Sequence, residues 1–149
     1  MLSWRLVLAV FTLAVAISVP YDVAAEAIGQ IKMVTGKAYI VRDQNQLMAQ
    51  AGDLLQQEDI LSTEADSTVG ITFIDNSRFS LGPDSRLELK QFRFNPTTRE
   101  GTFVSEIQRG TLAITSGHIA KSDPEAMKVR TPTTILGVQG TKFVVRVSE

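Results

Sequence analysis

Cysteine is absent from the chain, and histidine occurs once, as His118. The absence of cysteine excludes disulfide bonds, thiolate zinc sites and cysteine nucleophiles. A single imidazole also excludes metal sites that are built on two or three histidines. Because these groups are missing, most familiar classes of enzyme are disfavoured, and we expect neither a metal nor a cofactor.

An excess of charge of either sign is also missing. The 15 Lys and Arg residues nearly balance the 16 Asp and Glu residues in a chain of 149. A protein that binds nucleic acid by neutralising phosphates needs a basic excess, so we expect no nucleic-acid partner. The length and the hydrophobic fraction of 44% instead predict one globular domain with a buried core.

An apolar run stands near the N-terminus. It extends from Leu6 to Val19 after a single basic residue, and Pro20 and then small residues up to Ala25 follow it. This order is typical of a secretory signal peptide, and the run is shorter than the about 20 residues that cross a bilayer. We therefore predict a signal peptide over residues 1–25, helical where it is present, and a mature domain over residues 26–149. The alternative is an uncleaved N-terminal anchor.

A signal peptide of this kind predicts a periplasmic or secreted location in the bacterial envelope. Hydropathy offers no second membrane candidate in the sequence, so no membrane span is expected once the signal is cleaved. A mature chain without cysteine suits an oxidising compartment and does not depend on it.

Apolar residues of the predicted mature domain recur with a period of two, which is the spacing of half-buried strands. Val69, Ile71 and Phe73 alternate with small or polar residues, and Asp75-Asn76 then supplies a turn. Similar runs, separated by Gly, Pro, Asn and Asp, fill the rest of this part. The pattern predicts an all-β fold of about ten short strands in a compact two-sheet roll or sandwich. A short β-solenoid is the alternative architecture.

One of these runs changes parity. Leu87 and Leu89 share one parity, whereas Phe92 and Phe94 share the other. An extra residue in a strand resets the pleat. A β-bulge near Lys90-Gln91 would therefore bring all four side chains to the same face.

The segment 131–143, TPTTILGVQGTKF, resembles the C-terminal signature of the FecR domain, the periplasmic module named after the ferric-citrate regulator. The segment Phe73-Ile74-Asp75-Asn76-Ser77 resembles the family's F-x-D-G-S turn, Ser85-Arg86-Leu87 its S-x-L motif, and Gly110-Thr111-Leu112 its G-x-L motif. Further matches in family order stand at Gly36, Ala38, Val41, Gly52, Asp53, Asp59 and Thr63.

The resemblance implies an all-β domain of the periplasm that relays signals through protein contacts, in envelope or iron-related signalling. Two positions depart from the family pattern. Gln139 stands where the family usually has Arg, so a contact of that Arg is not carried over to this chain. Asn76 replaces Gly and tolerates the same left-handed conformation. The sequence also leads us to expect no anti-sigma segment of the kind that the regulator carries.

The signature segment has two compatible interpretations. Gly137 and Gly140 predict a kink as the chain enters its last strand, and Pro132 predicts an edge or a strand start. In the first interpretation the segment closes the fold, with Val138 and Phe143 packed inward. In the second, its loop presents a surface to an envelope protein. The candidate partner contacts are Thr131, Thr133, Thr134, Gln139 and Lys142. The candidate structural motif residues are Asp75, Asn76, Ser77, Pro132, Gly137, Gly140, Thr141 and Phe143.

Charge is unevenly distributed along the chain. The stretch from Asp43 to Ser77 holds seven acidic residues and no basic one, whereas Arg78 to Glu149 holds eleven basic and seven acidic residues. Such asymmetry steers partners or holds Ca²⁺. No D-x-D-x-D-G loop is present, so a solvated acidic edge is the favoured interpretation.

Catalysis has weak support in the sequence. His118 falls in a predicted turn near Ser116, Ser122 and Asp123, but no G-x-S-x-G motif accompanies a Ser-His-Asp triad. We therefore predict a non-enzymatic interaction or sensing module, and the sequence leaves its oligomeric state open. One alternative is an envelope protein that binds a small ligand or a glycan in a pocket lined by Tyr39 or exposed Phe. Another is a hydrolase with two facing carboxylates.

Overall fold

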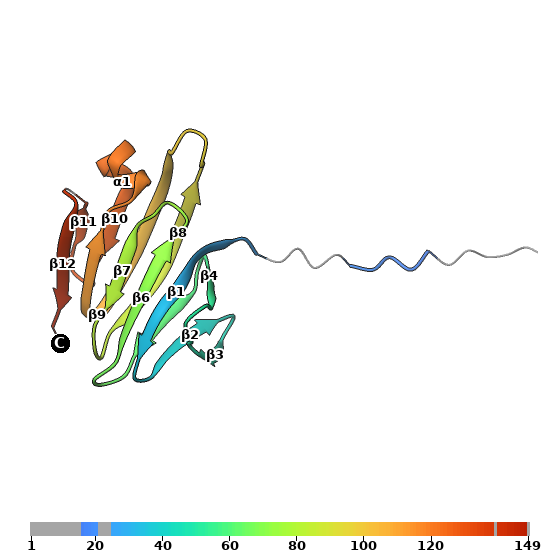
Figure 1. Cartoon of the computed structure of the whole chain (residues 1–149), viewed down its shortest axis with the longest axis horizontal. Helices are drawn as coiled ribbons and strands as arrows, with labels where there is room; N and C mark the ends of the chain where they lie inside the picture. Colours follow the sequence, from blue (N-terminus) through green and yellow to red (C-terminus); the bar gives the residue numbers. More distant parts are fainter. Residues whose placement is uncertain (1–15, 21–24, 139, 149) are drawn as a thin grey trace, which may run out of the picture.

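The computed structural model describes residues 16–20, 25–138 and 140–148. Most of the predicted signal peptide therefore lies outside the described residues, and the boundary at Ala25 stays a prediction. The described domain is made of strands with very little helix (Figure 1). No helix among the described residues has the length and apolar character needed to cross a membrane.

The strands form one continuous, curled sheet of twelve described strands. Its two halves face each other and share one long strand, β9, and they are called here the first and the second sheet. The first sheet runs, in spatial order, through β3 (Asn45–Met48), β2 (Ala38–Arg42), β5 (Ile60–Thr63), β8 (Arg86–Phe94), β9 (Gly101–Thr115), β10 (Met127–Arg130) and β11 (Ile135–Gly137). The second runs through β4 (Leu54–Gln56), β1 (Ala27–Thr35), β6 (Thr68–Phe73), β7 (Arg78–Leu81), β9 and β12 (Lys142–Val147). This arrangement confirms the predicted all-β two-sheet roll, and its mostly antiparallel pairing does not fit the alternative of a solenoid.

Strand β9 changes sheets near its middle. Its first part pairs with β8 as far as Arg109, and its second part, from Gly110 to Thr115, pairs with β12 and β7. Gly110 has a φ of 90° at the point of change, a conformation that glycine adopts readily and most other residues avoid. The two sheets are thus joined by a continuous strand that bends at a glycine.

A short helical segment connects β9 to β10. It consists of α1 (His118–Ser122) and the 3₁₀ turn Pro124–Ala126. The structure therefore places His118 at the first residue of a short helix, although the sequence predicts a turn there. This crossover lets β10 lie parallel to β9, the one parallel pair among the described strands.

The predicted bulge in β8 is confirmed. The register of β8 against β9 shifts between Leu89 and Gln91. Leu87 and Leu89 before the shift and Phe92 after it are all buried, and Phe94 packs against the same core. The extra residue therefore turns both halves of the strand towards the interior, as the change of parity requires.

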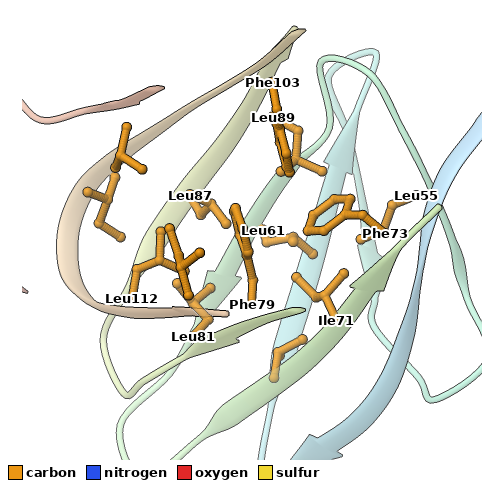
Figure 2. Close-up of a cluster of buried hydrophobic side chains, with 14 of the residues drawn as sticks. Leu55, Leu61, Ile71, Phe73, Phe79, Leu81, Leu87, Leu89, Phe103 and Leu112 are labelled. Atoms are coloured by element: carbon orange, nitrogen blue, oxygen red, sulfur yellow. The ribbon is translucent and has the colours of Figure 1, made fainter. Parts of the chain in front are cut away.

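The core between the sheets is built around aromatic rings. Phe73 and Phe79 come from one sheet and Phe103 from the other (Figure 2), and their ring centroids lie 4.7 to 5.1 Å apart. Aliphatic side chains from both sheets surround them, and the fully buried ones include Leu55, Leu61, Leu81, Leu87, Leu89 and Leu112. The interior is thus filled by side chains from both sheets, and the candidate sites lie at its corners and edges.

Candidate functional site

The residues of the F-x-D-N-S motif form a buried polar junction at the turn between β6 and β7. The Asp75 side chain is fully buried, and its carboxylate accepts hydrogen bonds from Ser77 N at 3.0 Å, Ser77 Oγ at 2.7 Å and Ile119 N at 3.4 Å. These donors satisfy a carboxylate that burial would otherwise penalise. Asp75 therefore ties the turn to the start of α1.

The same junction involves the backbone before α1. His118 N donates to Asp75 O at 2.8 Å, and Gly117 N donates to Ser77 Oγ at 3.1 Å. A Cβ on Gly117 would collide with Asp75 O and Ser77 N. Asn76 adopts a φ of 66° in the left-handed region, as its replacement of Gly predicts. The motif thus fixes a corner of the fold.

His118 does not form a catalytic triad. Its Nε2 lies 3.0 Å from Asn76 Nδ2, and its ring stacks on that of Phe94 with 6.1 Å between the ring centroids. Ser116 Oγ donates to Gly140 O, and Ser122 Oγ donates to Arg99 O. The sequence brings the candidate triad residues close along the chain, but the structure does not aim them at one another.

The S-x-L and G-x-L motifs meet at the corner where β9 bends. Thr111 N donates to Ser85 Oγ at 3.0 Å, and Ser85 N donates to Thr63 Oγ1 at 3.0 Å. Thr63 Oγ1 in turn donates to Gly82 O at 2.6 Å. These hydrogen bonds join three segments, namely β5, the β7–β8 loop and β9, so these family residues hold the two sheets together.

Asp59, another matched position, is a buried acid that forms an ion pair with the partly exposed Arg42. Arg42 Nε donates to Asp59 Oδ1 at 2.8 Å, and an Arg42 terminal nitrogen donates to Asp59 Oδ2 at 2.7 Å. Gln56 N adds a third donor to the same carboxylate. The Asp59 hydrogen bonds raise the pKa of Arg42 above its ordinary value. Asp59 therefore has a structural role. The predicted solvated acidic edge can involve only the exposed acids of the stretch from Asp43 to Ser77.

The acidic residues that the structure describes do not gather into an ion site. Within the described part of the chain there is no group of three or more His, Cys, Asp or Glu side chains placed to hold a metal. Tyr39, the residue that would line a glycan pocket, is half-buried, and its hydroxyl donates to Glu64 Oε1 at 3.0 Å. The structure thus leaves the signature segment as the most prominent candidate surface.

The first half of the signature segment is a tight turn between β10 and β11. Thr131 N donates to Thr134 O at 2.8 Å, and Thr131 Oγ1 accepts hydrogen bonds from the N–H groups of Thr133 and Thr134. Pro132 lies at the exposed tip of this turn, where its missing N–H breaks no ladder. The turn therefore holds three of the predicted contact residues together on the surface.

The second half crosses from the edge of one sheet to the edge of the other. Val138 is buried, and its N–H donates to Met127 O at 3.2 Å. Gly140 has a φ of 89°, and the carbonyls of Gly140 and Thr141 accept hydrogen bonds from Ser116. Phe143 then packs against the core as β12 begins. Gln139 lies outside the described residues.

A groove runs between the turn and the end of β12. It has a volume of about 340 Å³, and its lining includes Thr131, Pro132, Thr133, Thr134, Leu136 and Arg146. Lys142 is exposed on β12 opposite Thr115 and does not line the groove. The structure thus brings the three candidate threonines together and places Lys142 apart from them.

Sequence reasoning missed the exposed apolar side chains of β11 and β12. Ile135 is 60% exposed and Val144 66% exposed, and Leu136 is partly exposed on the same strand as Ile135. Strand β11 pairs only with β10 among the described strands, so its outer edge is free. Gly137 at its end adopts no positive φ, and a Cβ there would meet nothing. Apolar residues are usually expected to be buried. The exposure of Ile135 and Leu136 follows only from the position of β11 at the edge of the sheet.

The edge that carries this groove is basic. Lys128 and Arg130 on β10 and Lys142 and Arg146 on β12 are all exposed. The sequence from Met127 to Ser148 contains no acidic residue. An apolar strip with a basic rim is suited to recognising a partner surface that is apolar and acidic.

A comparison with models of protein families matches residues 59–149 to the family described as FecR protein. The match begins at the buried acid Asp59 and includes both corner motifs and the whole signature segment. The motifs at Gly36 and Gly52 lie before it. Searches among curated proteins and among solved structures found no match.

Proposed function

The chain belongs to the FecR protein family, and from this premise we propose that it is an exported, non-enzymatic module that binds a protein partner in the bacterial envelope. The family supports a role of the sensing or signalling type. The proposal assigns the partner contact to the surface formed by β10, the turn of residues 131–134, β11 and β12, called here the basic edge. Its location in the periplasm is part of the same proposal.

The observation that carries the proposal is the contrast between two sets of family residues. Those of the corner motifs, such as Asp75 and Ser85, are buried and occupied by internal hydrogen bonds. The basic edge, in contrast, exposes the side chains of Ile135 and Val144, and it also contains a groove and a free strand edge. Exposed apolar groups on an unpaired edge are disfavoured unless a partner covers them.

The mechanism of recognition that suits this edge is strand addition. A partner strand that pairs with β11 would receive main-chain hydrogen bonds, and its side chains would meet Ile135 and Leu136. The space over Gly137 would permit a close approach of the partner's backbone. The four exposed basic residues would select an acidic partner. Thr131, Thr133, Thr134, Gln139 and Lys142 are the proposed polar contacts.

The proposal is tested by crosslinking inside cells. A photoreactive residue in place of Thr133 is expected to capture an envelope protein, whereas one in place of Ser80, an exposed position on β7, is not. The captured protein is then purified, and its binding to the chain is measured by calorimetry. The double substitution Gln139→Ala with Lys142→Ala should weaken that binding while circular dichroism stays native. Unchanged binding would remove the signature segment from the interface.

A further inference from the structure

The two sheets leave the domain with two open ends, and the ends lie on opposite sides of the molecule. Strands β3 and β4 form one end, and β11 and β12 form the other (Figure 1). Among the described strands, each of these four pairs with a single neighbour. The main-chain groups of β3, β11 and β12 are therefore available for further pairing. The outer edge of β4 is occupied, because Leu54 O accepts a hydrogen bond from Arg42 and the N and O atoms of Gln56 bond to Asp59.

Both ends expose apolar side chains next to these edges. Leu47 and Leu54 are about half exposed at the first end, and Ile135 and Val144 are more exposed at the second. Strands β3, β4 and β11 carry no charged residue at all. Natural edge strands are usually protected by charged residues. Strands β3 and β11 are therefore unusually open to pairing, whereas Arg42 and Asp59 cover the edge of β4.

Each end also has a groove. At the first end a groove of about 590 Å³ is lined by Leu47 and Met48 of β3 and by Leu54 of β4. At the second end the groove of about 340 Å³ lies between the β10–β11 turn and β12. The first groove is also lined by polar side chains, those of Arg42, Gln50, Asp53 and Gln56. Each end thus has a groove beside a free strand edge, and the groove at the first end is the more polar one.

The ends differ in the sign of their charge. The sequence from Asp43 to Glu58, which contains β3 and β4, holds three acidic residues and no basic one. The sequence from Met127 to Ser148 holds four basic residues and no acidic one. Arg42 beside the first end does not change this contrast, because Asp59 neutralises it. Opposite charge would attract the two ends, and like charge would separate two copies of the same end.

We propose that copies of this chain associate head to tail, with the basic edge of one copy on the β3–β4 end of the next. In this arrangement β11 of one copy extends the sheet that ends at the other copy's β3, and the rest of the basic edge faces the groove at that end. The inference deepens the proposed function, because it names a second copy of the chain as a partner of the basic edge.

A second copy is favoured over other partners because this chain itself carries both complementary surfaces. A symmetric dimer through two basic edges would instead place four basic residues against four more. A head-to-tail contact leaves one free end on each terminal copy. Unless the rotation between copies closes a ring, the assembly therefore grows with protein concentration.

The test uses protein purified from the periplasm and analysed by sedimentation velocity across a range of concentrations. One variant blocks the basic edge with Ile135→Glu and Val144→Glu, and the other blocks the opposite end with Leu47→Lys and Leu54→Lys. All four side chains are exposed, so the fold should be retained. The unmodified protein is expected to increase in mass with concentration, and each variant alone is expected to remain a monomer.

An equal mixture of the two variants provides the decisive measurement. Each variant keeps one intact end, and the two intact ends are complementary, so association should return in the mixture. Recovery also shows that both variants are folded. High salt should weaken the association, because the charges are exposed. A monomeric unmodified protein, one variant that still dimerises alone, or a mixture that stays monomeric would each overturn the proposal.

Its failure is distinguishable from failure of the proposed function. If the pure protein is a monomer but the residue at position 133 captures another envelope protein in cells, head-to-tail association is wrong and the proposed function stands. If the pure protein associates as expected and only copies of itself are captured, the relay to another protein is wrong. The two experiments therefore test separate statements about one surface.

Discussion

The Ser85 hydroxyl occupies the space that a side chain on Gly110 would need. Ser85 Oγ accepts a hydrogen bond from Thr111 N and donates one to Pro83 O, each at 3.0 Å. A Cβ on Gly110 would collide with the Ser85 side chain and with its Cα. Because Gly110 also has a positive φ, this corner of β9 depends on glycine for both space and conformation.

Substitution of Gly110 should therefore be severe. We expect Gly110→Ala to lower the free energy of unfolding by at least about 2 kcal/mol, since the strained conformation and the clash add together. Gly137→Ala is the matched control, because it lies in open space without a positive φ and should change stability by less than about 1 kcal/mol. Urea denaturation followed by circular dichroism measures both. Equal effects would contradict the role given to this corner.

A second prediction concerns the buried carboxylate of Asp75. Asp75→Ala removes the acceptor of three hydrogen bonds and leaves Ser77 N and Ile119 N without it. We expect a loss of about 2–4 kcal/mol, because several buried polar groups lose a charged partner at once. Asp66→Asn changes an exposed turn acid that has a φ of 58°, a conformation Asn tolerates, and should have little effect. Thermal denaturation distinguishes the two variants, and a mild Asp75→Ala would show that the junction is dispensable.

Much of this fold could be predicted because its cause is local. Alternation of apolar residues sets the inward face of each strand, and the parity change in β8 predicted its bulge before any partner strand was known. The pairing of β9 with four neighbours was not predictable in this way. It depends on contacts between residues far apart in the chain, which no local pattern encodes.

The candidate site shows the same limit. Thr131, Thr133 and Thr134 come together because one short turn holds them, whereas Lys142 belongs to a different strand and stands apart. Ile135 has the composition of a core residue, and its exposure follows only from the edge position of β11. Local contacts within one turn therefore bring the three threonines together, and the global arrangement of the sheets decides which residues form a surface.

Tyr39 offers a spectroscopic test of the acidic side of the molecule. The hydrogen bond to Glu64, followed by partial burial and the Glu64 charge, raises the pKa of Tyr39 above its ordinary value. The Tyr39 phenol therefore loses its proton at a higher pH in the folded state than in the unfolded state. Any stability that it contributes is therefore complete below about pH 10, the unfolded pKa, and is lost as the pH rises through the folded value. Tyr39 is the sole tyrosine of residues 26–149, so ultraviolet titration reports it alone.

We expect Glu64→Ala to lower the midpoint of this titration towards the ordinary value. Glu58→Ala, which removes an exposed acid that does not bond the phenol, should leave the midpoint nearly unchanged. A midpoint that is the same in the unmodified protein and in Glu64→Ala would show that the hydrogen bond does not persist in solution.

The Arg42–Asp59 ion pair allows the contribution of a largely buried ion pair to stability to be compared with that of a more exposed pair in the same molecule. Asp59 is 1% exposed and Arg42 27% exposed, so Arg42→Ala leaves a buried carboxylate with one main-chain donor, Gln56 N. Removing one partner of a fully buried pair costs about 3–5 kcal/mol. Because Arg42 is partly solvated, we expect about 2–3 kcal/mol by urea denaturation.

Two comparisons show whether geometry or charge is responsible. Arg42→Lys keeps the charge but loses the bidentate contact, so it should recover only part of the stability. Lys90→Ala breaks the more exposed contact with Glu88 at 3.0 Å and should cost at most about 1 kcal/mol. If Lys90→Ala proved as costly as Arg42→Ala, burial would not be what strengthens the Arg42–Asp59 pair. If Arg42→Lys restored full stability, charge alone would hold the end of the domain where β2 and β4 meet.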